Sequence, residues 1–149
     1  MGVVRESIAV PLPPQRAREL WIDLRRWPTF IEGFARVLEA DPEWPATGSK
    51  VVWESIPEGR GRVTERVVES SPDRIVTEVF EDALTGRQST IFEPQGDETL
   101  VEVELDYELT RGGVLRAITD VVFIRRALSA ALARTLRRFA VEAVEEASM

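Results

Sequence analysis

Residues 114–147 read VLRAITDVVFIRRALSAALARTLRRFAVEAVEEA and contain neither proline nor glycine. Apolar residues recur in this segment every three or four positions, which is the spacing of one face of an α-helix, and the arginines between them predict its solvated face. At about 1.5 Å per residue the helix would extend about 50 Å, so it needs one broad apolar surface to lie against. The expected apolar rows are Val114, Ile118, Val121, Ile124, Leu128, Leu132, Thr135 and Phe139, and then Leu115, Val122, Leu136, Ala140 and Ala143.

The residues before this helix predict that surface, because they read as a run of antiparallel strands. The clearest strand covers residues 100–109, where Tyr107 and four aliphatic residues alternate with acidic residues. Such alternation is typical of a sheet that is covered on one side only. A long helix held in a curved sheet usually leaves a cavity between the two. A small-molecule site in that cavity is therefore our leading hypothesis.

Proline, glycine and polar turn residues divide the rest of the chain into short elements. One strand is expected over residues 3–10, a helix over 15–26, and a second short helix over 29–34. The helix over 15–26 places Trp21 on its buried side, where we expect a core residue. Together with the long C-terminal helix this is an α+β fold, and we expect a single domain over residues 1–149. The remaining strands of a curved antiparallel sheet of about seven are expected over 35–40, 50–56, 62–70, 74–81, 88–92 and 100–109.

The composition excludes several kinds of chemistry. The chain has no cysteine and no histidine, which rules out disulfides, thiolate catalysis, the usual zinc sites and histidine catalysis. It also lacks a glycine-rich phosphate loop and a calcium-binding spacing of acidic residues, so no metal and no other cofactor is expected. A net charge of −7 argues against nucleic acid as a partner. Without a membrane span or a signal peptide, we expect a cytoplasmic protein, either a monomer or a homodimer.

Short motifs stand at the joints between the expected elements. The order of these motifs, with one strand, two short helices, six strands and one long helix, resembles the START/Bet v 1-like (SRPBCC) superfamily. Its bacterial polyketide cyclase/dehydrase branch is the most similar. The resemblance covers essentially the whole chain and implies a helix-grip fold with a deep apolar cavity. The motifs are Val10-Pro11, Leu20-Trp21, Trp27-Pro28-Thr29-Phe30, Glu93-Pro94, Gly96-Asp97-Glu98-Thr99, Tyr107-Glu108-Leu109 and Gly112-Gly113.

Two residues are the candidates for catalysis. The family pattern implies that Thr64, Arg66 and Val68 face the cavity, where the Arg66 guanidinium could hold a carboxylate, enolate or phenolate oxygen. The alternative is that Arg66 faces solvent or pairs with a glutamate across the sheet, because a shift of one residue in register would expose it. Tyr107 faces inward by the strand pattern, and it is either a hydrogen-bond donor to a ligand carbonyl or a core tyrosine.

Other side chains are candidates for ligand contact. The turn between the two short helices is expected to bring aromatic residues to the mouth of the cavity. The family pattern implies inward-facing positions on the strand over 88–92, and the strand over 100–109 has an apolar side. Trp44, which lies between two prolines in a loop, is either a lid or a local anchor. The ligand-binding candidates are Trp27, Phe30, Phe34, Trp53, Thr64, Gln88, Thr90, Phe92, Val103 and Leu105.

Three functions agree with these features. The first is the binding of a hydrophobic small molecule, such as a lipid, a quinone or a polyketide-like compound. The second is a cyclase, aromatase or dehydratase that uses Arg66 and Tyr107, with orientation of the substrate as its main effect. The central strands are mostly aliphatic, unlike those of aromatase/cyclases, so the cavity suits an aliphatic ligand as well as a fused-ring one. The third is a protein that acts as the co-factor of a protein partner through its acidic strand faces and its arginine-rich helix.

Overall fold

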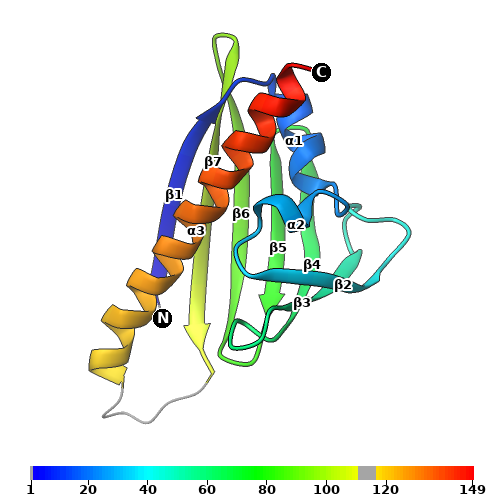
Figure 1. Cartoon of the computed structure of the whole chain (residues 1–149). Helices are drawn as coiled ribbons and strands as arrows, with labels where there is room; N and C mark the ends of the chain where they lie inside the picture. The colour runs from blue at the N-terminus through cyan, green and yellow to red at the C-terminus, as the bar shows by residue number, and fades with distance from the viewer. Residues whose placement is uncertain (1, 111–116) are drawn as a thin grey trace.

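The computed structural model describes the backbone of residues 2–110 and 117–149, and the side chains of the same residues except 117–121. One antiparallel sheet and three helices make up this part of the chain (Figure 1). The elements in chain order are β1 (Gly2–Val10), α1 (Pro14–Ile22), α2 (Trp27–Phe30), β2 (Phe34–Ala40), β3 (Lys50–Ser55), β4 (Arg62–Ser71), β5 (Arg74–Phe80), β6 (Leu84–Gln95), β7 (Glu98–Leu109) and α3 (Ala117–Ala147).

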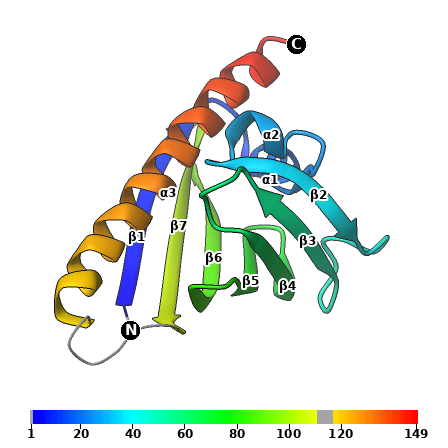
Figure 2. The same ribbon diagram turned by 60° about the horizontal axis from the view of Figure 1, so that its bottom comes forward.

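The described strands form a seven-stranded sheet in the order β1-β7-β6-β5-β4-β3-β2. Every neighbouring pair is antiparallel. β1 and β2 are the two edge strands, and β1 pairs with β7 along its whole length. Register shifts occur in β2 and at the β4–β5 pair, and such irregularities bend a strand. Figure 2 shows the sheet curving around the helices. The predicted helix-grip fold, with about seven strands and two short helices after the first strand, is confirmed.

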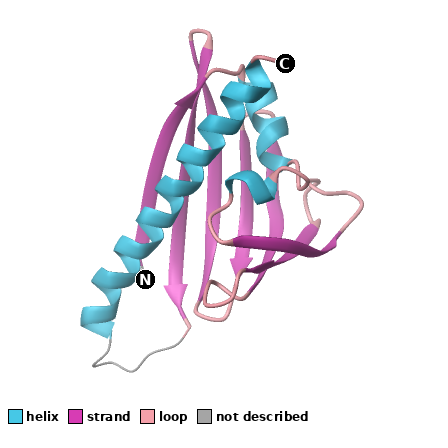
Figure 3. Ribbon diagram, in the orientation of Figure 1, coloured by secondary structure: helices cyan, strands magenta, loops and turns pink. Residues whose placement is uncertain are grey.

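The helices lie on one face of the sheet, which we call the inner face (Figure 3). α3 runs along β1 and β7, and α1 and α2 lie beside its C-terminal half (Figures 1 and 2). Leu136, Phe139 and Ala143 are buried on the predicted apolar face of α3, but Val122 is 53% exposed, so its assignment to that face was wrong. Val114 and Leu115 lie outside the described residues, as do the side chains of Ile118 and Val121. The arginines at 125, 126, 134, 137 and 138 are exposed, as expected of the solvated face.

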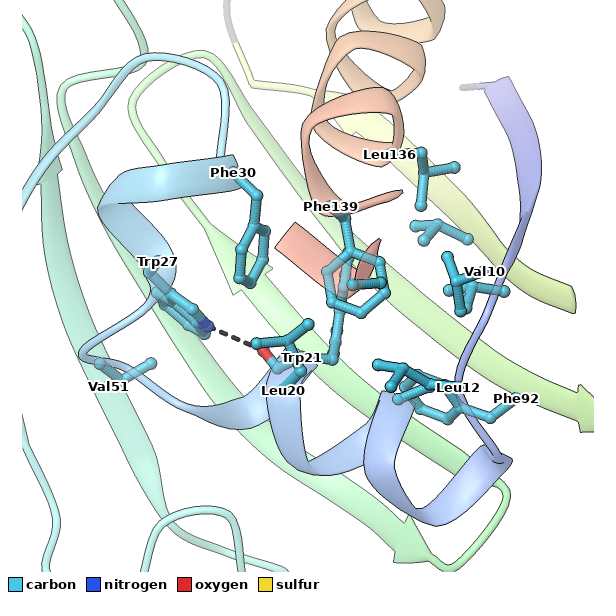
Figure 4. Packing of buried hydrophobic residues seen from close by; sticks show 14 of the residues in the cluster. Val10, Leu12, Leu20, Trp21, Trp27, Phe30, Val51, Phe92, Leu136 and Phe139 are labelled. Carbon is cyan, nitrogen blue, oxygen red and sulfur yellow. Dashed lines mark hydrogen bonds between the residues drawn. The ribbon is translucent and has the colours of Figure 1, made fainter. Parts of the chain in front are cut away.

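Aromatic packing fills the space between the inner face and the C-terminal half of α3 (Figure 4). The Trp21 ring stacks on Phe30 with centroids 5.6 Å apart, and Phe139 meets both rings edge-on at 5.1 Å. Aromatic pairs in such arrangements stabilise a core by about 0.5–1.5 kcal/mol beyond their buried area. A second, smaller cluster beside the N-terminal half of α3 contains Val4, Leu84, Leu105 and Tyr107, with Ile124 and Leu128 of α3 packed against it.

Some element bounds differ from those expected, and each difference has a local cause. α2 begins at Trp27, because Pro28 stands in the first turn of the helix, where a missing N–H leaves no bond unmade. β6 is longer than the expected residues 88–92 and contains Gly86. A Cβ on Gly86 would lie 2.7 Å from the Asp106 carbonyl oxygen, so this glycine allows a close approach of two strands rather than marking a turn.

Candidate functional site

The inner face of β4 carries one acidic residue among apolar ones. Val63, Glu65 and Val67 are buried on this strand, whereas Arg66 is exposed on the opposite face. The neighbouring strand β3 contributes Trp53, which is fully buried and lies opposite Val63 in the register. The strand pairing therefore turns the carboxyl group of Glu65 into the space under the helices.

Both carboxyl oxygens of Glu65 accept a hydrogen bond. The Trp53 indole N–H donates to Oε2 at 2.8 Å, and the Thr77 hydroxyl donates to Oε1 at 3.3 Å. Burial raises the pKa of the Glu65 carboxyl above its ordinary value, while these hydrogen bonds and the positive charge of Arg60 act in the opposite direction. Because desolvation outweighs the partners, Glu65 holds its proton to a higher pH than an exposed glutamate does. A buried acid of this kind is suited to hydrogen-bond donation or proton transfer.

An ion pair lies next to the same tryptophan. The Arg60 guanidinium carbon is 5.1 Å from the centre of the Trp53 ring, and Arg60 Nε donates to Glu81 Oε2 at 2.7 Å. The negative charge of Glu81 adds to the raised pKa of Glu65. Arg60 thus satisfies Glu81 directly and acts on Glu65 only at a distance.

A small cavity lies beside the Glu65 carboxyl group. Its volume is about 10 Å³, which is room for about one water molecule. Glu65 on β4, Thr77 on β5 and Gln88 on β6 form its polar side, and Thr77 and Gln88 lie opposite each other in the register. The other walls of the cavity are Trp21, Ile22, Trp27, Trp44 and Ile75.

Trp44 is the one wall of this cavity that comes from a loop, at residues 41–49 between β2 and β3. Its indole N–H donates to the Ile22 carbonyl oxygen at 3.0 Å, and its ring meets Trp27 edge-on with centroids 5.8 Å apart. Trp27 is fixed in turn, because its own indole N–H donates to the Trp21 carbonyl oxygen at 2.8 Å (Figure 4). The loop is therefore anchored to α1 and at the same time closes the cavity.

The prediction that Arg66 faces the cavity is wrong. Arg66 is exposed on the outer face, opposite Lys50 and Glu78 on the neighbouring strands, and Thr64 shares that face. Before the irregularity between Val67 and Glu69, the register is shifted by one residue from the expected one, and this shift reverses the side chains of that part of the strand. An outward-facing Arg66 does not reach a ligand on the inner face, and Thr64 is excluded as a ligand contact for the same reason.

Tyr107 faces inward as predicted, but it belongs to the second cluster and not to the cavity beside Glu65. It lies opposite Gly2 at the start of β1, and a Cβ on Gly2 would lie 2.6 Å from the Tyr107 hydroxyl oxygen. The sheet order places β7 three strands away from β4. The structure therefore does not bring together Tyr107 and Arg66, the two residues predicted to act as a pair.

The other candidates divide between the cavity and the core. Trp27 and Gln88 line the cavity, whereas Trp53 does not line it but donates a hydrogen bond to Glu65, which does. Phe30 was expected near the mouth, but it is completely buried between Trp21 and Phe139. The remaining candidates, which all lie on the inner side, are Phe34, Thr90, Phe92, Val103 and Leu105. Thr90 is completely buried, and its hydroxyl has no hydrogen-bond partner in the described part of the chain.

A larger groove, of about 880 Å³, lies on the surface beside the first turns of α1 and the β4–β5 turn. Its walls include Arg18, Ser70 and Phe92, and Arg18 Nη2 donates to the Ser70 hydroxyl at 2.7 Å. None of the groups around Glu65 lines this groove. Size alone therefore does not select the site, and the buried carboxyl group with its aromatic walls is the better candidate.

Comparison with known families assigns the chain to one of them. The family model described as polyketide cyclase / dehydrase and lipid transport matches residues 1–144, and the chain belongs to this family. The superfamily resemblance seen in the sequence is thereby confirmed. No curated protein sequence matches the chain.

Several solved structures share the fold at low sequence identity. Protein CV1439 from Chromobacterium violaceum is 16% identical with a TM-score of 0.72, and the match covers 95% of this chain and 96% of that one. The di-domain ARO/CYC StfQ of the steffimycin biosynthetic pathway is 18% identical with a TM-score of 0.76, over 99% of this chain and 52% of that one. A norcoclaurine synthase point mutant from Thalictrum flavum is 12% identical with a TM-score of 0.71, over 97% and 95% of the chains.

None of the helices in the described part of the chain is long and apolar enough to cross a membrane.

Proposed function

We propose that this chain binds a hydrophobic small molecule on the inner face of its sheet, at the cavity beside Glu65. The observation that carries the proposal is a buried carboxyl group that forms the polar side of a cavity with Thr77 and Gln88, while the other walls are indole and aliphatic side chains. Small-molecule sites combine such apolar walls with a few placed polar groups. Membership of a family described by cyclases, dehydrases and lipid transport supports the same kind of ligand.

The body of a ligand needs more room than the cavity of about 10 Å³ provides. Trp44 is the wall that can give this room, because it is half-buried and belongs to a loop rather than to the sheet or a helix. Displacing its ring would break the single hydrogen bond to the Ile22 carbonyl oxygen. The proposed route of entry is therefore between α1 and the loop at residues 41–49.

Binding of an apolar fluorescent probe tests this proposal. Nile red should bind wild-type protein, and a long-chain fatty alcohol should displace it. Trp44→Ala should raise the association rate by about tenfold or more, because the side chain that closes the cavity is gone. The matched control is Leu38→Ala, which removes an exposed apolar side chain of β2 outside the cavity and should leave the rate unchanged. Absence of displaceable binding to the wild type, or equal association rates in both variants, would refute the proposal.

A second function, that of a cyclase or dehydratase, is favoured by the raised pKa of the buried Glu65 carboxyl. An acid that stays protonated to a higher pH can donate its proton to a carbonyl or hydroxyl oxygen and take a proton from a neighbouring carbon. In this form of the hypothesis Glu65 replaces Arg66 as the acting group. Turnover of a poly-β-ketone by the wild type and its loss in Glu65→Gln, with ligand binding retained, would distinguish catalysis from binding alone.

A further inference from the structure

Most hydrogen-bond donors around the cavity beside Glu65 are already used, whereas several acceptors remain free. The indole N–H groups of Trp27 and Trp44 already donate to main-chain carbonyl oxygens, and that of Trp53 donates to Glu65. The Thr77 hydroxyl hydrogen is also used, because it donates to Glu65 Oε1. Lone pairs of the Glu65 carboxyl group, the Thr77 hydroxyl and the Gln88 side-chain oxygen therefore remain on the polar side of the cavity, together with the amide N–H donors of Gln88.

The aromatic walls have the same electrostatic character. Trp21, Trp27 and Trp44 line the cavity together with Ile22, Ile75 and the polar side chains. The face of an indole ring carries negative potential and attracts a cation, most strongly where water is excluded. Arg60, the cation that acts on Glu65 from the β3–β4 turn, bonds Glu81 and does not line the cavity. No charged side chain from α1, α2 or the loop at residues 41–49 is among the described residues that line it.

We propose that the head group bound in this cavity is a primary ammonium, so that the ligand is a hydrophobic amine. This inference rests on the proposed binding of a hydrophobic molecule at the same site. An ammonium group is about the size of the one water molecule for which the cavity has room, and it has three donors and no acceptor. It would donate to the Glu65 carboxylate, the Thr77 hydroxyl oxygen and the Gln88 side-chain oxygen. The rings of Trp21 and Trp27, which stay in place when Trp44 moves, would stabilise its charge.

The charge of the ligand gives this binding a pH dependence. A cation stabilises the ionised form of Glu65, and in the free protein burial holds the pKa of that carboxyl above its ordinary value. Below the raised pKa, binding therefore releases a proton, and the affinity for the cation rises with pH until the pH passes that pKa. Above it the affinity is constant until the ammonium group itself loses its proton. Arg60 and Glu81, the other charged groups that act on Glu65, are paired with each other. A ligand carbonyl that accepts from protonated Glu65 would show the opposite trend.

The test compares benzylammonium with ethylbenzene, in which a methyl group replaces the ammonium group. Titration followed by tryptophan fluorescence should give at least about tenfold tighter binding of benzylammonium at pH 8. Glu65→Gln should remove this preference and its pH dependence, with ethylbenzene binding retained. The matched control is Glu78→Gln, which removes one negative charge from the outer face of β5 and should leave the preference intact.

Equal or tighter binding of ethylbenzene by the wild type, or an affinity for benzylammonium that falls as the pH rises, would overturn the ammonium head group and leave the hydrophobic site standing. Failure of both probes to bind would refute the ammonium head group together with the hydrophobic site.

Discussion

At the scale of single residues, Glu65 is the group in this protein whose burial needs the most explanation. A carboxyl group in an apolar core costs stability unless it is hydrogen-bonded or neutral. Here it accepts bonds from the Trp53 indole and the Thr77 hydroxyl, both of which are neutral donors. Arg60 lies close enough to act on its charge, but Arg60 is bonded to Glu81. The fold thus keeps Glu65 satisfied without a direct counter-ion.

The raised pKa of Glu65 predicts how the stability of the protein depends on pH. A carboxyl group whose pKa is higher in the folded state than in the unfolded state binds more protons when folded. Its contribution is therefore largest below the unfolded pKa and is lost as the pH rises through the folded pKa. Glu65→Gln removes this loss. The difference in melting temperature, variant minus wild type, should therefore increase as the pH is raised from about 4 to about 8.

Melting curves followed by circular dichroism across this pH range measure the difference. Glu78→Gln, which changes the same residue type on the outer face of β5, is the reference. A difference from the wild type that follows the same pH course in both variants would show that the burial of Glu65 is not its cause.

The same strand shows where sequence patterns stop being informative. Val63 and Val67 on one face of β4 compete with Val68 on the other, so the count of apolar residues hardly separates the two registers. The correct register buries the acidic Glu65 in the core. By residue type alone it is therefore less favourable than the other register, in which Arg66 would face a polar ligand site. In β7, by contrast, every residue of one face from Val101 to Leu109 is apolar or Tyr107, and the inward side was predicted correctly. The site escaped prediction because its central residue breaks the rule that identifies a strand face.

At the scale of elements, two sets of ion pairs connect the region around α2 to α3. Arg26 Nη2 lies 2.8 Å from Glu142 Oε2, and its Nη1 lies 3.2 Å from Glu146 Oε2. After α2, the Glu32 carboxylate lies 3.0 Å from both Arg134 and Arg138. The backbone N–H of Glu32 also donates to the Thr135 hydroxyl at 3.0 Å. These contacts keep α2 against the helix that covers the sheet, and so they hold Trp27 in the wall of the cavity.

Arg26→Gln should weaken this connection. Arg26 loses two carboxylate partners, and because its side chain is only 27% exposed, the loss should be at the upper end for surface pairs, about 1 kcal/mol in the free energy of unfolding. Urea denaturation at low salt measures the effect, which should shrink in high salt because ions screen the pairs. Arg25→Gln is the control, since its guanidinium is 90% exposed and pairs only with the nearby Asp23. It should have no measurable effect, and equal losses in both variants would contradict the role assigned to Arg26.

At the scale of the whole molecule, the long helix and the curved sheet meet through a small number of aromatic side chains. Trp21, Phe30 and Phe139 fill the space beneath the C-terminal half of α3, and Trp21 also lines the small cavity beside Glu65. In this region, aromatic side chains therefore occupy the space that a ligand would need. The order of strands and helices could be predicted from turns and periodicity alone. The degree of filling could not, because it depends on how side chains from α1, α2 and α3 meet in space.

Phe139→Ala tests whether this aromatic cluster joins the helix to the sheet. Phe139 is completely buried and contacts two aromatic rings, so its truncation removes packing and leaves a cavity that a close-packed core fills only in part. We expect a loss of about 3–5 kcal/mol in the free energy of unfolding, measured by urea denaturation. Phe123→Ala makes the same change in the same helix at a side chain that is 72% exposed, and its effect should stay within about 0.5 kcal/mol. Because both changes remove the same atoms and alter helix propensity equally, the difference between them isolates packing against the sheet. If Phe139→Ala were no more destabilising than Phe123→Ala, α3 would have to be held to the sheet mainly by Ile124, Leu128 and the other contacts of its N-terminal half.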